Sequence, residues 1–516
     1  MHRYSHYFPV RTAADHLDVV PLLQAGFASR AGHTLLEFNG VATSFAEMEH
    51  LVKRMRAWLQ QQGIARGDRV ALMLDNGLEH MALIYALMLT GAVWVPVNTR
   101  LKAPGISYLL GHCKPALFVA QPGFADALAG LDTPPARLAW INEIALPEVA
   151  ADAPLTAEPV APEDTLCLIY TSGTTGAPKG VVFTHRMMRI ASEGTVIVSA
   201  VKAGDRMFVW EPLCHIGGAQ LLLVPFLEEV SLHVIERFSA TRFWPQVEQA
   251  QATHLHYLGG ILDILCQLPP EVQPARHTLR VGWGAGVSAK AWDGIKNRLG
   301  IALRECYGMT EGSSFTTVNN TGKTGSIGRA LPWLRVELLD DGDRPVPIGE
   351  LGQIVVSSEV EGCFLPGYLD NPKASAEARR GGKLYTGDMA RMDADGDLFF
   401  VGRKTDSMRV RGENVSAWEI ERIFVMHPAI AAAAAIGVDS EVGEQEIMLY
   451  VQFKEGMQES FDALARWAHS RLASYQLPRY YLRAEAFETT LSERIRKHLL
   501  SRDLSAAWDR NAHASK

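Results

Sequence analysis

The first hundred residues alternate short apolar runs with helical patterns. A strand-like run over 34–38 precedes apolar residues at 48–59 that recur with the 3.6-residue period of an α-helix. A second apolar run over 68–74 precedes a helical pattern at 81–89, and a third run follows at 92–97. Alternation of this kind predicts an α/β fold in which mostly parallel sheets are covered by helices on both faces.

The segment from Met81 to Val97 has no charged residue, which raises the possibility of a membrane span. Its seventeen residues are at the short limit for a span, and they include Gly91 and Pro96. A buried helix that turns at Gly91 into a buried strand explains the segment better. We therefore expect no membrane span.

The composition narrows the classes of protein and partner. A chain of 516 residues suggests two to four domains, and 47% apolar residues are enough for a large core. The net charge of −7, without a long basic run, argues against nucleic acid as the main partner. Six scattered cysteines without a CxxC pair, and an N-terminus without the apolar region of a signal peptide, predict a cytoplasmic protein with free thiols.

A stretch rich in glycine and hydroxyl side chains lies between two strand-like runs, at 165–169 and 181–183. It reads Tyr170-Thr171-Ser172-Gly173-Thr174-Thr175-Gly176-Ala177-Pro178-Lys179-Gly180. Glycines let backbone N–H groups turn toward a ligand, and the hydroxyls and the lysine add donors, so the stretch predicts a polyphosphate site. It is not a Walker loop, because Pro178 stands where that pattern needs glycine. An ordinary surface loop is the alternative.

The stretch 306–312, Cys-Tyr-Gly-Met-Thr-Glu-Gly, combines an aromatic ring with phosphate- and metal-binding groups. The ring of Tyr307 can stack on a purine, and Gly308 allows close approach. Thr310 offers a hydroxyl donor to the α-phosphate, and Glu311 is a hard carboxylate suited to Mg²⁺. The alternative is a capped helix N-terminus. Further along, Asp388 can accept two hydrogen bonds from vicinal ribose hydroxyls.

Two other motifs are less specific. The glycine-rich turn Gly282-Trp283-Gly284-Ala285-Gly286 follows a strand-like run, and such turns bind ligands in α/β sheets. His215 follows Pro212-Leu213-Cys214, where a structural histidine is the simpler interpretation from spacing alone.

Taken together and in this order, the motifs resemble those of the adenylate-forming superfamily, which includes the acyl-CoA synthetases. The sequence Gly412-Glu413-Asn414-Val415-Ser416 is most similar to the crotonobetaine/carnitine-CoA ligase branch. The resemblance implies an enzyme that activates a carboxylic acid with ATP and Mg²⁺ as acyl-AMP, releases pyrophosphate, and transfers the acyl group to CoA. It also implies a possible homodimer.

The resemblance further implies the architecture and the site residues. The large N-terminal domain is expected over 1–404, with a small barrel-like part, and a mobile α+β C-terminal domain over 405–516, with a hinge at Thr405 or Asp406. His215 is expected beside the acyl pocket, and Thr174 joins Glu311 as a metal ligand. The nucleotide would be bound by Thr171, Ser172, Gly173, Thr174, Thr175, Gly176, Lys179, Gly284, Ala285, Gly286, Tyr307, Gly308, Met309, Asp388, Arg403 and Gly412.

One position departs from the family pattern. The family has a catalytic lysine near the C-terminus, and the register of Ser492, Ile495 and Lys497 places Arg494 at that position. Guanidinium is a planar fork whereas ammonium is a point charge, so we expect slower adenylation. Two alternatives to a working synthetase remain: an adenylating enzyme that passes the acyl group to a carrier protein or an amine, and a non-catalytic relative that binds nucleotide or acyl groups.

Overall fold

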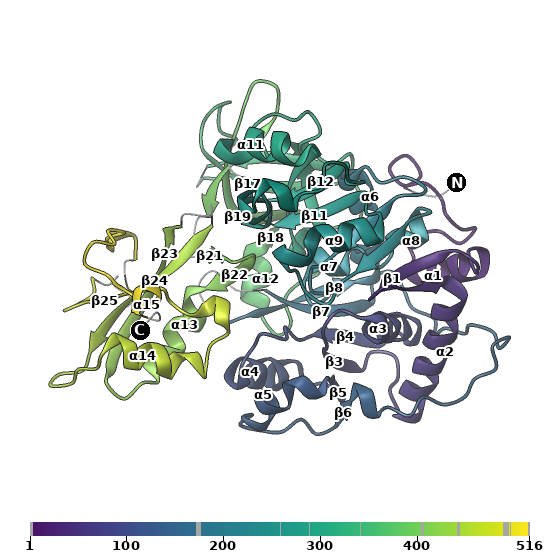
Figure 1. The fold of residues 1–516 in the computed structure, drawn as a ribbon, viewed down its shortest axis with the longest axis horizontal. Coiled ribbons are helices and arrows are strands. Elements are labelled where there is room, and N and C mark those ends of the chain that lie inside the picture. Colours follow the sequence, from purple (N-terminus) through teal and green to yellow (C-terminus); the bar gives the residue numbers. More distant parts are fainter. Residues whose placement is uncertain are drawn as a thin grey trace.

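The computed structural model describes residues 4–171, 177–258, 260–287, 289–340, 342–403, 407–440, 444–488, 495 and 497–513. The fold is α/β, with a large N-terminal part and a smaller C-terminal part that lies to one side of it (Figure 1). This architecture is the one that the sequence predicts. The predicted boundary after residue 404 falls on undescribed residues and stays a prediction.

The first sheet of the large part has six strands and is parallel except where its last strand turns back. Its order is β6 (Leu138–Trp140), β5 (Leu117–Ala120), β3 (Arg69–Met73), β4 (Val93–Pro96), β7 (Thr165–Thr171) and β8 (Lys179–Thr184). β7 and β8 are antiparallel, so the glycine-rich stretch between them connects two neighbouring strands.

The second sheet has nine strands and a parallel centre. Its order is β15 (Arg329–Ala330), β14 (Ser314–Val318), β13 (Ala302–Met309), β12 (Val281–Ala285), β11 (His254–Leu258), β9 (Arg206–Val209), β10 (Ser231–Val234), β1 (Thr34–Phe38) and β2 (Val41–Ser44). The strands from β13 to β1 are all parallel. Because parallel strands end at the same edge, the loops after β9, β11, β12 and β13 meet there.

Helices cover both sheets (Figure 1). Those of the large part are α1 (Val19–Ser29), α2 (Phe45–Gln61), α3 (Leu78–Thr90), α4 (Ala103–Cys113), α5 (Ala125–Ala129), α6 (His185–Ser199), α7 (Ile216–Ala219), α8 (Val224–Leu227), α9 (Ala240–Ala250), α10 (Gly260–Gln267), α11 (Ala289–Leu299) and α12 (Pro372–Ala378). Ser44 caps α2 through a reciprocal capping box with Glu47, as a Ser followed by Glu three residues later predicts.

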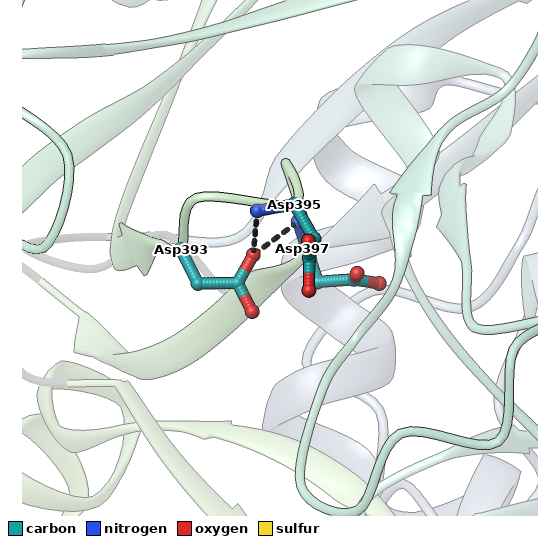
Figure 2. A group of neighbouring side chains, drawn as sticks. All are labelled: Asp393, Asp395 and Asp397. Atoms are coloured by element: carbon teal, nitrogen blue, oxygen red, sulfur yellow. Dashed lines mark hydrogen bonds between the residues drawn. The ribbon is translucent and has the colours of Figure 1, made fainter.

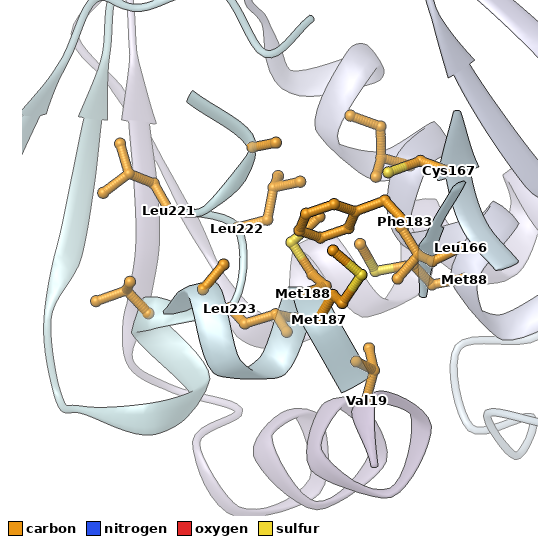
Figure 3. Close-up of a cluster of buried hydrophobic side chains, with 14 of the residues drawn as sticks. Val19, Met88, Leu166, Cys167, Phe183, Met187, Met188, Leu221, Leu222 and Leu223 are labelled. Atoms are coloured by element: carbon orange, nitrogen blue, oxygen red, sulfur yellow. The ribbon is translucent and has the colours of Figure 1, made fainter. Parts of the chain in front are cut away.

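The core of the large part lies between the two sheets. Figure 3 shows Val19 of α1, Met88 of α3, Phe183 of β8 and Met187 of α6 converging in one apolar cluster. α3 is buried on nearly all sides and ends at Gly91 in the left-handed conformation, which explains the charge-free segment at 81–97. No helix in the described part of the chain is long and apolar enough to cross a membrane.

One predicted element differs. The apolar residues 219–227 predict a single buried helix, but α7 ends at Ala219 and α8 begins at Val224. Pro225 has no N–H for an intrahelical hydrogen bond and its ring clashes with the preceding turn, so a continuous helix cannot pass through it. The segment is nevertheless buried.

An antiparallel sheet and the small domain follow. The sheet contains β16 (Leu334–Leu339), β17 (Gly352–Ser358), β18 (Arg379–Arg380), β19 (Lys383–Met392) and β20 (Leu398–Arg403), and it corresponds to the predicted barrel-like part. The small domain contains the hairpin β21 (Ser407–Val410) and β22 (Glu413–Ser416), and a sheet of β23 (Ile430–Asp439), β24 (Gln445–Phe453), β25 (Tyr480–Arg483) and β26 (Trp508–Asp509). Its helices are α13 (Ala417–Val425), α14 (Phe461–His469) and α15 (Arg510–His513).

Candidate active site

A cavity of about 1800 Å³ opens where the strands of the large sheet end and the small domain docks. The large domain contributes residues from the ends of β7, β11, β12 and β13 and from the segments after β9, β12 and β13, and the small domain contributes residues from its hairpin and from 471–476. Residues that are far apart in the sequence therefore surround one space. The cavity has room for a nucleotide and a second substrate.

At one end of the cavity, an aromatic ring is joined to a carboxylate. The hydroxyl of Tyr307 donates to Oδ2 of Asp388 over 2.6 Å, and both side chains are buried. β19 and β20 form an antiparallel hairpin, and their register places Asp388 opposite Arg403 in the backbone ladder. Gly308 is required by the protein itself, because a Cβ there would lie 1.8 Å from the carbonyl oxygen of Ser314.

A second feature of the cavity is a buried carboxylate that contacts the start of the glycine-rich stretch. Oε1 of Glu311 accepts from the hydroxyl of Tyr368 over 2.8 Å and from that of Thr171 over 3.4 Å. The ammonium of Lys179 lies 5.0 Å from the centre of the Tyr368 ring. Thr310 also lines the cavity, so hydroxyl, ammonium and carboxylate groups converge there.

A second buried carboxylate supports the glycine-rich turn. Glu305 accepts from the N–H groups of Gly286 over 2.5 Å and Val287 over 3.2 Å, and from the hydroxyl of Tyr257 over 2.7 Å. Burial raises the pKa of Glu305 to about 7, although these hydrogen bonds oppose the rise. At Gly284, φ is +154° and a Cβ would lie 1.9 Å from the carbonyl oxygen of Tyr257, so only glycine fits.

A pair of side chains links the two domains across the cavity. Oε2 of Glu413, on the small-domain hairpin, lies 2.9 Å from Nε2 of His215, and its Oε1 lies 3.3 Å from the Arg100 guanidinium. Burial opposes the charged form of Glu413, but His215 and then Arg100 lower its pKa to about 2. Burial likewise disfavours the charged form of His215, yet Cys214 and Glu413 raise its pKa well above the usual value. We infer an imidazolium–carboxylate pair.

Most of the site residues proposed from sequence lie together. Those that line the cavity are Thr171, Lys179, His215, Gly284, Ala285, Gly286, Tyr307, Gly308, Met309, Thr310, Glu311, Asp388 and Gly412. Ser172, Gly173, Thr174, Thr175 and Gly176, the hinge residues Thr405 and Asp406, and Arg494 lie outside the described residues. Of Arg403, only the backbone at the end of β20 is described.

Sequence reasoning did not assign roles to Tyr368, Glu305 or Glu413. Glu413 lies in the motif 412–416, which resembles the crotonobetaine/carnitine-CoA ligase branch. That resemblance is a signal that could have identified Glu413 as a functional residue. Glu305 lies two residues before Tyr307, and Tyr368 lies in a Gly-Tyr-Leu-Asp-Asn-Pro stretch, without any local pattern that points to a ligand. Their roles depend on contacts with distant strands.

Asp393, Asp395 and Asp397 form an acidic group close enough to hold a metal ion, in the turn between β19 and β20 (Figure 2). Asp393 accepts from the backbone N–H groups of Asp395 and Asp397, as the dashed lines in Figure 2 show. The ammonium of Lys323 contacts Asp393 and lies 2.9 Å from Asp395 and 3.7 Å from Asp397. Arg329 pairs with Asp397 over 2.8 Å. The protein thus supplies its own cations to this turn.

Comparisons with known proteins agree with the geometry. The family model described as AMP-binding enzyme matches residues 23–369, and the model described as AMP-binding enzyme C-terminal domain matches 419–494. The crotonobetaine/carnitine–CoA ligase of Shigella dysenteriae serotype 1 is 30% identical over 458 residues, which cover 85% of this chain and 89% of that protein.

Two solved structures of one enzyme are similar to different extents. The o-succinylbenzoate-CoA synthetase of Bacillus subtilis, as a double mutant bound with a product analogue, has a TM-score of 0.84 at 22% identity, covering 94% of this chain and 98% of that chain. The same enzyme in complex with its acyl-adenylate intermediate has a TM-score of 0.69 at 22% identity, covering 94% of this chain and 99% of that chain.

Proposed function

Because the chain belongs to the family of AMP-binding enzymes, within the adenylate-forming superfamily, we propose that its cavity performs two half-reactions with distinct sets of residues. The chain is an AMP-forming acyl-CoA ligase, which forms acyl-AMP with release of pyrophosphate and then transfers the acyl group to CoA. The observation that carries the proposal is one cavity that joins the Tyr307–Asp388 pair of the large domain to Glu413 of the small domain.

The first half-reaction needs groups that bind a triphosphate and stabilise charge on the α-phosphate. Lys179 and Thr310 are donors for phosphate oxygens, and both line the cavity. The buried carboxylate of Glu311 would hold Mg²⁺, with Thr174 as a second ligand; the ion would neutralise phosphate charge when bound. Asp388 would accept hydrogen bonds from the ribose hydroxyls, and Tyr307 fixes the orientation of its carboxylate.

The second half-reaction needs a thiol to enter between the domains. The similarity is greater to the B. subtilis enzyme with a product analogue than to the same enzyme with its acyl-adenylate, which favours a thioester-forming arrangement of the two domains. In this arrangement Glu413 meets His215, while Lys102, Arg411 and Arg471 also line the cavity. We propose that this basic rim binds the phosphates of CoA.

The position of Arg494 bears on the first half-reaction only. In the thioester-forming arrangement the small domain presents its hairpin to the cavity, and we propose that a rotation about 404–406 brings Arg494 to the α-phosphate instead. Loss of one donor of this kind typically costs about 3–4 kcal/mol, and the guanidinium would retain part of that stabilisation.

We propose a cytoplasmic location because all six cysteines are free thiols. We also propose that two copies of the chain associate, as the family resemblance implies. Sedimentation velocity at micromolar concentration would detect a dimer, and a monomer over the same range would contradict it.

The proposed function is tested by pyrophosphate release from MgATP across a panel of carboxylic acids, with and without CoA. The wild type is compared with Arg494→Lys, and Arg496→Lys is the control for the same chemical change two residues away. We expect CoA-dependent thioester formation by the wild type, and faster pyrophosphate release by Arg494→Lys but not by Arg496→Lys.

Other outcomes separate the alternatives. Pyrophosphate release without thioester formation would favour a carrier protein or an amine as the acceptor. No turnover by any of the three proteins, with AMP still bound in calorimetry, would refute the enzyme and favour a nucleotide-binding relative.

A further inference from the structure

The cavity continues past the glycine-rich turn into a region lined by polar side chains. β11 and β12 pair in parallel, with Leu258 opposite Ala285 at the turn and His256 opposite Trp283 two residues deeper. Glu211 follows β9, the other neighbour of β11, and enters the same region. Asp388, by contrast, lines the cavity from β19, so the nucleotide and acyl parts of an acyl-AMP would meet different strands.

Two ionisable side chains form a close, buried pair in this region. Oε2 of Glu211 lies 2.5 Å from Nδ1 of His256, and the two residues are 3% and 4% exposed. Apart from this contact with each other, neither atom has a hydrogen-bond partner among the described residues. Both residues nevertheless line the cavity. A carboxylate can accept more hydrogen bonds than the one contact that His256 offers, and native proteins rarely leave such buried capacity unused, so this pair at a cavity wall points to a ligand that donates to it.

Two tryptophans contact His256 and hold it in place. The ring of Trp283 lies 4.1 Å from that of His256 between centres, and Trp210 donates its indole N–H to the backbone oxygen of His256 over 2.7 Å. Trp283 is fully buried and does not line the cavity, so it supports the histidine from the protein interior. On the other side, Glu211 packs on Gly217, where a Cβ would lie 2.4 Å from Oε2.

A second polar pair continues the same wall. The hydroxyl of Ser314 donates to Oε1 of Gln220 over 2.5 Å, and both side chains are buried and line the cavity. Ser314 pairs with Met309 across the β13–β14 ladder, which places it next to the proposed α-phosphate site at Thr310. Both polar pairs, Ser314–Gln220 and Glu211–His256, therefore line the same cavity.

From this arrangement we propose that the acid substrate carries a hydroxyl or amino group on its acyl part, which donates a hydrogen bond to Glu211 beside His256. A carboxylate only accepts hydrogen bonds, so it selects donors. An unsubstituted alkyl or aryl acid would cover the carboxylate without donating to it, and sites built to hydrogen-bond a substrate group strongly reject analogues that lack the group. The inference rests on the proposed synthetase function and specifies its substrate class.

The test compares matched acids in the pyrophosphate-release assay: propanoate, butanoate and benzoate, each beside its hydroxy and amino derivatives. For the wild type we expect the donor-bearing member of at least one set to be favoured about 100-fold or more in kcat/KM. Glu211→Leu should reduce that ratio to within a few fold. Glu236→Leu, which removes a half-exposed glutamate after β10, should leave it unchanged.

Two further measurements keep the outcome interpretable. AMP affinity by calorimetry should be unchanged in Glu211→Leu, because Asp388 lies on β19 and is hydrogen-bonded to Tyr307, whereas Glu211 follows β9. If that variant does not fold, Glu211→Gln serves instead, since it keeps the shape and a neutral acceptor and should lower the ratio partially.

The results distinguish the inference from the proposed function. A wild type that activates unsubstituted acids as well as their derivatives would overturn the inference and leave the synthetase intact. An unchanged ratio in Glu211→Leu would also overturn it. Failure to activate any acid while AMP still binds would refute the proposed function, and the inference with it.

Discussion

The link between the domains at Glu413 predicts a selective defect in the second half-reaction. In Glu413→Gln the side chain keeps its shape and one hydrogen-bond acceptor, but it loses the charge that faces His215 at 2.9 Å and Arg100 at 3.3 Å. The pKa of Glu413 falls from its ordinary value near 4.5 to about 2, which corresponds to roughly 3 kcal/mol in favour of the charged carboxylate.

Only part of this energy belongs to the domain contact, since the amide retains a hydrogen bond. A loss of about 1.5 kcal/mol would lower the population of the thioester-forming arrangement roughly tenfold relative to the alternative. We therefore expect thioester formation from preformed acyl-AMP to slow about tenfold, while pyrophosphate release stays within about twofold of the wild type. Single-turnover mixing with CoA measures the first rate, and a coupled pyrophosphate assay measures the second.

The control is Glu485→Gln, which makes the same change at a position on the small domain whose side chain is 86% exposed. The pH dependence has a definite sign. The link is complete while His215 is protonated, and it is lost as pH rises through the raised pKa of His215. Thioester formation by the wild type should therefore decline at alkaline pH more steeply than that of Glu413→Gln. Equal slowing of both half-reactions, or an unchanged thioester rate, would refute this reasoning.

Three further predictions follow from single contacts. Asp388→Asn should weaken AMP binding about tenfold or more in calorimetry, because hydrogen bonds to a charged group contribute about 1.5–3 kcal/mol; unchanged affinity would remove Asp388 from the nucleotide site. Since burial raises the pKa of Glu305 to about 7, the folded state binds the proton more tightly than the unfolded state, and this residue's contribution to stability declines as pH rises from about 4.5 to about 7. The wild type should thus lose up to roughly 3 kcal/mol relative to Glu305→Gln between pH 5 and pH 8 in urea unfolding, and an opposite slope would contradict the assignment. Gly284→Ala should strongly destabilise the protein, since its Cβ would meet a carbonyl oxygen at 1.9 Å, whereas Gly294→Ala on α11, with nothing within 4 Å, should stabilise it by about 0.5–1 kcal/mol; similar melting temperatures for both would count against the steric argument.

Local patterns in the sequence were sufficient for much of the fold. The helical period at 48–59 corresponds to α2, and the charge-free run at 81–97 corresponds to α3 and β4. A helix buried on one face has apolar residues at a regular spacing, and an element buried on all faces has an unbroken apolar run. The prediction of a single helix over 219–227 was wrong. The apolar residues correctly indicated that the segment is buried, but the prediction did not take into account that Pro225 interrupts a helix.

The sequence also identified the family correctly, from motifs whose chemistry is contained in a few neighbouring residues. Tyr307, Thr310 and Glu311 lie in one short stretch, so the nucleotide- and metal-binding groups could be proposed together. The roles of these residues remain predictions for the experiments above.

By itself, then, the sequence determined the family, the order of strands and helices along the chain, and the residues expected to bind ATP. Each of these depends on the spacing of residues along the chain. Only the tertiary structure decided which distant groups become partners. His215 meets Glu413 from another domain, Glu211 meets His256 from another strand, and Glu305 supports a turn that lies on its neighbour strand. The physical reason is that periodicity records which face of an element is buried, whereas the identity of the partner depends on how strands pair and how the domains dock.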